Sequence, residues 1–121
     1  SPESVRAGVW AWYRVKARDY FDRRLAEWEQ KLPWVSSRPT FRLQEMEKRW
    51  GSCTASGEII LNPHLIKAPR ECIDYVILHE LAHLRHHNHS PEFWNTINFA
   101  DPDWQRKKAL LDGAAEQLTA K

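Results

Sequence analysis

Residues 79–89 read H-E-L-A-H-L-R-H-H-N-H, and this run decides how the rest of the chain is interpreted. On a helix, side chains four residues apart stack on one face, so His79 and His83 would lie together with Glu80 beside them. Two stacked imidazoles and a neighbouring carboxylate are the zinc ligands and the general base of the H-E-x-x-H signature. The pattern therefore predicts a metal site, provided that the segment is helical.

The surrounding residues favour a helix from Arg70 to His87. Pro69 ends the preceding segment, and Glu71 and Asp74 suit the positive end of a helix dipole. The run is too long for a strand, and apolar residues surround most of the cylinder, which predicts a buried central helix. Such a helix needs a partner for its histidines and glutamate, because charged glutamate is rarely buried unpaired.

A third metal ligand is expected, because a catalytic zinc usually has three protein ligands and one open position. If the helix runs straight to His87, that residue lies ~12 Å along the axis from the first histidine. His86 and His87 are therefore interpreted as polar residues at a helix end. Asn88 tolerates the left-handed conformation that ends many helices, and Ser90-Pro91 is a good helix start. The predicted reversal brings His89 back toward the metal.

A second unusual cluster precedes the helix and consists of Arg49, Trp50, Gly51, Ser52 and Cys53. Gly51 permits a backbone conformation that is closed to other residues, and a tight loop around a buried Trp50 accounts for the cluster on structural grounds. The functional interpretation places the loop beside the metal, where its backbone N–H groups, Ser52 or Arg49 would steady substrate charge. At this point both interpretations stay open.

The pattern along the chain predicts an α+β fold. Alternating residues predict a strand at Thr40–Glu47, and Ile-Ile-Leu predicts a second at 58–61, so the two can pair as a hairpin or join a small sheet. Helices are expected at 3–31, 91–99 and 103–118. We expect one domain over residues 1–121, with a small antiparallel sheet beside the buried metal helix and flanking helices.

Composition limits the class of protein. The 121 residues suit one domain, and the start at Ser1-Pro2 fits a processed chain or an excised domain. Neither a signal peptide nor an apolar run of ~20 residues is visible, so we expect a cytoplasmic protein with no membrane partner. Residues 1–57 carry 11 Lys/Arg against 7 Asp/Glu, and the rest carry 7 against 9. This excess is small for a nucleic-acid-binding protein.

Four segments carry a family resemblance: R-W-G-S-C at 49–53, L-N-P-H-L at 61–65, I-D-Y-V-I-L-H-E-L-A-H-L-R at 73–85 and N-H-S-P-E-F-W at 88–94. Together they resemble the YgjP-like metallopeptidase domain family, which is similar to the SprT-like and WLM groups of small zincins. The resemblance runs from about Phe41 to Trp94 and more loosely through the N-terminal helix. It implies a zincin-like fold, metal ligands at His79, His83 and His89, and a catalytic base at Glu80. Zincins often bind an extended peptide along an edge strand.

The ligand spacing also equals that of the metzincins, which place a glycine three residues after the second histidine and use a downstream Met-turn. Here that position is His86 and the only methionine, Met46, lies upstream, so the metzincin assignment fails.

The expected activity is zinc-dependent hydrolysis of a peptide or protein substrate, with Glu80 taking a proton from the attacking water. A metal-dependent phosphohydrolase acting on nucleotides is an alternative, because the same groups can attack phosphorus. A DNA-associated or binding module with a structural metal is another, although such a metal has no use for Glu80. The oligomeric state is left open.

Overall fold

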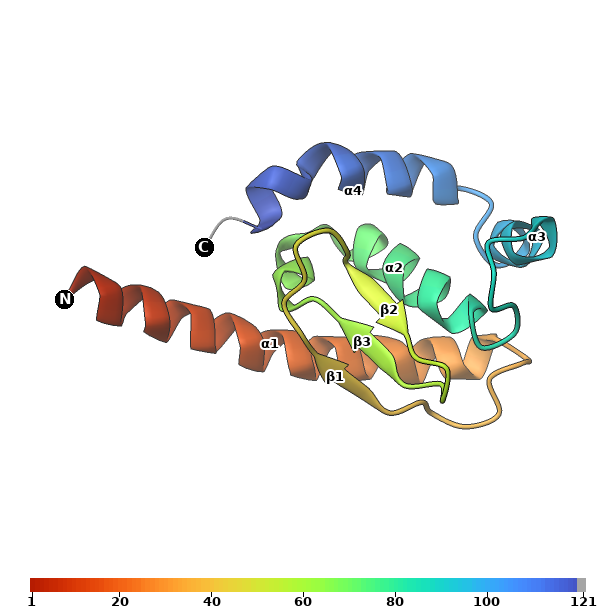
Figure 1. The fold of residues 1–121 in the computed structure, drawn as a ribbon, viewed down its shortest axis with the longest axis horizontal. Helices are drawn as coiled ribbons and strands as arrows, with labels where there is room; N and C mark the ends of the chain where they lie inside the picture. Colours follow the sequence, from red (N-terminus) through yellow and green to blue (C-terminus); the bar gives the residue numbers. More distant parts are fainter. Residues whose placement is uncertain (120–121) are drawn as a thin grey trace.

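The computed structural model describes the backbone of residues 1–119 and the side chains of residues 1–116 (Figure 1). The α+β class predicted from the sequence is confirmed. The elements in chain order are α1 (Pro2–Lys31), β1 (Phe41–Leu43), β2 (Gly51–Cys53), β3 (Ile59–Leu61), the 3-10 helix η1 (Pro63–Lys67), α2 (Arg70–Ala82), α3 (Pro91–Ala100) and α4 (Trp104–Thr119).

The three strands form a mixed sheet in the order β1-β3-β2, so the expected antiparallel sheet was wrong in one pairing. β2 pairs antiparallel with β3, whereas β1 pairs parallel with β3. A tight turn accounts for this topology, because Gly57 has φ 93° and its N–H donates to the Thr54 carbonyl at 2.9 Å. β2 therefore forms the hairpin with β3, and β1 pairs with the opposite edge of β3.

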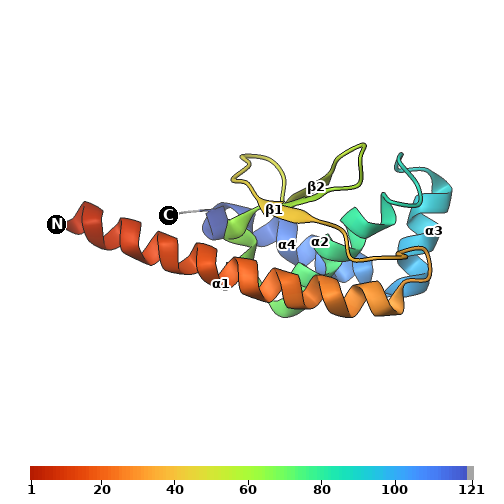
Figure 2. The ribbon, with the colours of Figure 1, turned by 90° about the horizontal axis from the view of Figure 1, so that it is seen from below.

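α2 is the central helix, and it lies between α1 and α4 (Figures 1 and 2). As predicted, it is buried around most of its circumference. The N-terminal part of α1 extends beyond the rest of the molecule. No helix in the described part of the chain is long and apolar enough to cross a membrane. The core contains Phe21, Leu25, Ile59, Leu61, Ile73, Ile77, Leu78, Leu81, Phe93 and Ile97.

Polar contacts hold α2 near both of its ends. Near the start, the Arg24 guanidinium donates two hydrogen bonds to the Asp74 carboxylate, at 2.8 and 3.0 Å, and the Trp28 indole donates to the same carboxylate. Near the end, the Trp34 indole N–H donates to the Leu81 carbonyl at 2.8 Å. That carbonyl belongs to the last turn of the helix, where partners within the helix run out.

α2 ends earlier than predicted. It stops at Ala82 rather than His87, and His83 is its C-cap residue with φ −67° and ψ −18°. The next turn is tightened by N–H to carbonyl bonds three residues apart, including those from Leu84 and Arg85, both 3.1 Å long. No described residue other than a glycine has a positive φ, so the left-handed conformation expected at Asn88 was also wrong. The chain still bends at His87 and Asn88, after this tightened turn, so the change of direction falls near the predicted place without that conformation.

α3 begins as predicted. Ser90 is its N-cap, and the Ser90 hydroxyl accepts a hydrogen bond from the Phe93 backbone N–H at 3.3 Å. Pro91 occupies the first helical position, where a missing N–H costs nothing. This start directs α3 away from the reversal and leaves His89 in the connecting segment, one residue before the cap.

Candidate metal centre

The structure brings the three histidines expected to bind metal into one cluster. α2 supplies His79 and its C-cap His83, and the segment before α3 supplies His89. One ring nitrogen of each lies within 4.8 Å of the others, and the Nε2 atoms of His79 and His89 are 3.2 Å apart. Tetrahedral zinc with Zn–N bonds of ~2.0–2.1 Å separates two ligand nitrogens by about 3.3 Å. The three-imidazole donor set and the spacing of His79 and His89 therefore fit zinc.

The His83 ring is oriented by the backbone of the turn that follows α2. Its Nδ1 lies 3.1 Å from the carbonyl oxygen of His86, so a proton on Nδ1 donates to that carbonyl and leaves the Nε2 lone pair free. Metal-binding histidines are usually oriented in this way by the other ring nitrogen. The sequence interpretation gave His86 no part in the site, and its contribution comes from the backbone rather than the imidazole.

The His79 and His83 imidazoles are held in the neutral form that a metal requires. Burial, reinforced by the neighbouring His83 and His89, lowers the pKa of His79 to about 3. Burial also lowers the pKa of His83. A ligand that needs no deprotonation near pH 7 releases no proton on binding metal, which favours affinity at that pH.

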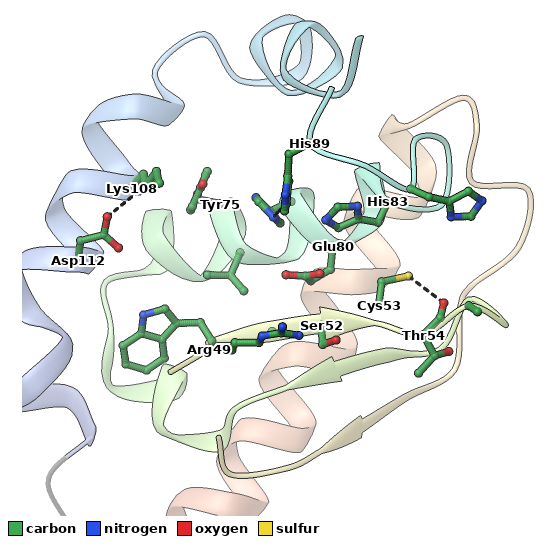
Figure 3. Close-up of a pocket in the computed structure, with 16 residues that line it drawn as sticks. Arg49, Ser52, Cys53, Thr54, Tyr75, Glu80, His83, His89, Lys108 and Asp112 are labelled. Carbon is green, nitrogen blue, oxygen red and sulfur yellow. Dashed lines mark hydrogen bonds and ion pairs between the residues drawn. The ribbon is translucent and has the colours of Figure 1, made fainter. Parts of the chain in front are cut away.

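Glu80 is 6% exposed and faces β2 across a narrow gap (Figure 3). A Cβ atom at Gly51 would lie 3.0 Å from the Glu80 Cγ and 3.1 Å from its Oε2. Gly51 has no positive φ, so the conformational reason proposed for it was wrong, and the close approach of Glu80 and Val76 explains it instead. Burial raises the pKa of Glu80 to about 7, and the charge of Arg49 opposes that rise.

The histidines and Glu80 open into a cleft of about 790 Å³. Arg49, Trp50, Gly51 and Ser52 all line it, so the second sequence cluster lies beside the first. Gly51, Ser52 and Cys53 of this cluster form strand β2, so these three residues are not the tight loop of the structural interpretation. Figure 3 shows Arg49 and Ser52 across the cleft from α2.

Several residues of the cleft were missed by sequence reasoning. Tyr75 comes from α2, and α4 contributes Lys108 and Asp112, which are ion-paired at 2.7 Å. Cys53, which already belongs to the second sequence cluster, lies beside Glu80, and burial raises the pKa of its thiol. No sequence signal separates the Lys108–Asp112 pair from the many ion pairs one turn apart on exposed helices.

One edge of the sheet faces the cleft, and β2 forms it. Trp50 and Thr54 form backbone hydrogen bonds of 2.9 Å with residues flanking β3. In an antiparallel pair the alternate residues point their N–H and C=O groups the other way. The backbone groups of Gly51 and Cys53 therefore point toward the open edge. β2 is therefore the edge strand that borders the candidate site.

Comparison with solved structures places this fold among the metallopeptidases. The metallopeptidase zymogen abylysin of Pyrococcus abyssi matches with a TM-score of 0.67 and 23% identity, over 84% of this chain and 97% of that one. The zymogen jannalysin of Methanocaldococcus jannaschii matches with a TM-score of 0.62 and 17% identity, over 82% and 96%. At these identities the likeness concerns the fold.

The chain belongs to the YgjP-like metallopeptidase domain family, whose sequence profile matches residues 1–114. The resemblance noted in the sequence is thereby confirmed and extends through α1 and most of α4. No curated protein matches the chain. Family and fold are those of metal-dependent peptidases, and peptides or proteins are the substrates that such a family implies.

Proposed function

We propose that the protein is a zinc-dependent peptidase whose metal is held by His79, His83 and His89, with Glu80 as general base. The observation that supports this most is the convergence of three imidazole nitrogens within 4.8 Å, next to a buried carboxylate in an open cleft. We also propose that residues 1–121 form one domain, because α1 to α4 share a single core.

The bound zinc would supply a water of lowered pKa and polarise the substrate carbonyl. Glu80 accepts the proton of the attacking water on its carboxylate and returns it to the nitrogen of the leaving amine. A buried carboxyl at the edge of the cleft suits both steps, because it must take up and release a proton in each cycle. The absence of a Cβ at Gly51 leaves the room that this carboxylate occupies beside β2.

The substrate is proposed to bind as an extended strand along β2. The N–H and C=O groups of Gly51 and Cys53 face the open edge and would pair with it, as in other cases of strand addition. Backbone pairing fixes the peptide's direction and depth without demanding a particular side chain. Specificity would then come from cleft residues such as Tyr75, Lys108 and Asp112.

A metal-dependent phosphohydrolase is the second candidate, and Arg49 is the observation in its favour. Arg49 lines the cleft and is near enough to lower the pKa of Glu80, yet it forms no ion pair with another described side chain. A guanidinium so placed suits a phosphate group. A purely structural metal is disfavoured, because structural zinc sites are closed by a fourth protein ligand whereas this cluster faces a cleft.

The test begins with elemental analysis of the purified protein. The zinc-loaded protein is then incubated with a mixture of unstructured peptides and, separately, with nucleoside triphosphates. Glu80→Gln and a chelated sample serve as controls. Peptide cleavage that both controls abolish is the expected result. Phosphate release without peptide cleavage would replace the peptidase with the phosphohydrolase, and absence of stoichiometric metal would overturn both.

A further inference from the structure

Phe93 contacts all three candidate ligands. Its ring centroid lies 5.0 Å from that of His79, 4.5 Å from His83 and 5.0 Å from His89. No other aromatic ring in the described part of the chain contacts all three. Trp94, the neighbour of Phe93, contacts His79 and His89 only.

The Phe93 ring lies on the protein side of the cluster. It is 0% exposed, whereas His89 is exposed and the other two histidines are half-buried. The ring stacks on His83 with an interplanar angle of 28° and meets His79 and His89 edge to face, at 72° and 83°. Both arrangements are favourable for aromatic pairs. Together they restrict the rotation of all three imidazoles from the buried side of the cluster.

The same short segment places both Phe93 and the third ligand. His89 precedes the cap of α3 by one residue, and Phe93 lies in the first turn, where its N–H is bonded to Ser90. One turn later, Ile97 enters the core and is also 0% exposed. The segment carrying His89 is therefore fixed to the core through α3, close to the ligand.

We infer that Phe93 is a positioning residue for the metal, acting as an aromatic floor that directs the three imidazole nitrogens toward one point. This inference rests on the metal site proposed above. The ring bonds to nothing at the centre and takes no part in the reaction. Its effect comes from its flat, rigid shape, which a flexible aliphatic side chain of similar size does not reproduce.

The experiment compares Phe93→Leu with Ile97→Val. Both remove a similar small volume from fully buried positions on the same helix, but Ile97 has no aromatic ring to pack against the three histidine rings. Zinc affinity is measured by competition with a coloured chelator, and the visible spectrum of the cobalt-substituted protein reports ligand geometry. Phe93→Met has a side chain of similar size and retains an apolar core contact, so it replaces Phe93→Leu if that variant does not fold.

The expected result is a 10- to 100-fold loss of zinc affinity in Phe93→Leu, the range typical when groups that orient metal ligands are changed. Its cobalt spectrum should also change, whereas Ile97→Val matches wild type in both measurements. Wild-type affinity and spectrum in Phe93→Leu would overturn the inference, as would an equal loss in Ile97→Val. Failure of the wild-type protein itself to bind zinc would instead overturn the proposed function.

Discussion

A missing side chain at Gly51 makes room for the carboxylate that the proposed mechanism needs. Glu80 projects from α2 directly onto β2, and the separation leaves no room for a Cβ atom. The neighbouring atoms belong to Glu80 and Val76, both held on a buried helix, so neither moves away cheaply. The close approach of α2 to β2 thus explains both why residue 51 is a glycine and where the Glu80 carboxylate lies.

Gly51→Ala should therefore impair hydrolysis more than metal binding. The added methyl group overpacks the contact with Glu80, at a cost of about 1–3 kcal/mol in unfolding free energy. Rates are measured per bound metal, alongside thermal melts. Gly113→Ala is the matched control, because a Cβ there meets nothing within 4 Å and the helix gains ~0.5–1 kcal/mol. Unchanged activity in Gly51→Ala would separate this contact from catalysis.

Glu80→Gln should abolish hydrolysis while keeping the metal, because the amide cannot accept a proton and a base of this kind contributes ~10²–10⁴ in rate.

Burial raises the pKa of Glu80 from 4.5 to about 7, so its stabilising contribution is complete below pH 4.5 and is lost as pH rises through 7.

The measurement is the difference in unfolding free energy between metal-free Glu80→Gln and metal-free wild type across pH 4 to 9. The difference should move in favour of the variant by about 3 kcal/mol between pH 4.5 and 8. Taking a difference removes the opposite trend from His79, whose depressed pKa makes the folded state lose stability as pH falls from 6.5 toward 3. A pH-independent difference would place Glu80 in contact with solvent.

At the scale of elements, α2 is positioned by contacts that join residues far apart in sequence. Asp74 is bound by Arg24 and Trp28 of α1, and the Leu81 carbonyl is bound by Trp34 from the segment after α1. Leu81 lies two residues before His83, so the Trp34 contact stabilises the turn in which the helix ends and the second ligand sits.

Trp34→Phe should therefore loosen the end of α2. The Leu81 carbonyl keeps its bond from the Leu84 N–H, so the expected loss is only that of a typical hydrogen bond, about 1 kcal/mol in unfolding free energy. Chemical denaturation measures this loss, and a zinc titration should show weaker binding. Trp12→Phe, at a residue that is 55% exposed, is the control and should change neither. Equal stability of the two variants would contradict a role for the indole N–H.

What the sequence predicts here is set by local rules. The starts of α1, α2 and α3, the apolar character of α2 and the clustering of His79 with His83 follow from helical periodicity and capping. β2 was missed because Gly-Ser-Cys has little strand propensity, and its pairing with β3 makes it a strand. The early end of α2 was missed for the same kind of reason, since its last turn is bound by Trp34, 47 residues away.

At the scale of the molecule, the proposed metal would link two segments that meet at the histidine cluster. α2 supplies two ligands and the segment before α3 supplies the third, while Phe93 packs against all of them. Within the cluster, the Nε2 atoms of His79 and His89 are 3.2 Å apart. Two such nitrogens can share one hydrogen bond only when one ring carries a proton there and the other does not.

Removal of the metal should accordingly lower the melting temperature of the whole domain. Binding only to the folded state adds ~4 kcal/mol at a thousandfold excess over Kd, or roughly 15 °C for a chain of this size. Thermal melts with chelator and with zinc added back measure the shift.

His89→Ala should remove this response, whereas His87→Ala should keep it, because His87 lines the same cleft but lies outside the cluster. The reverse pattern would make His87 the third ligand. An unchanged wild-type melt, with loss of metal verified by elemental analysis, would mean that packing around Phe93 alone holds the two segments together.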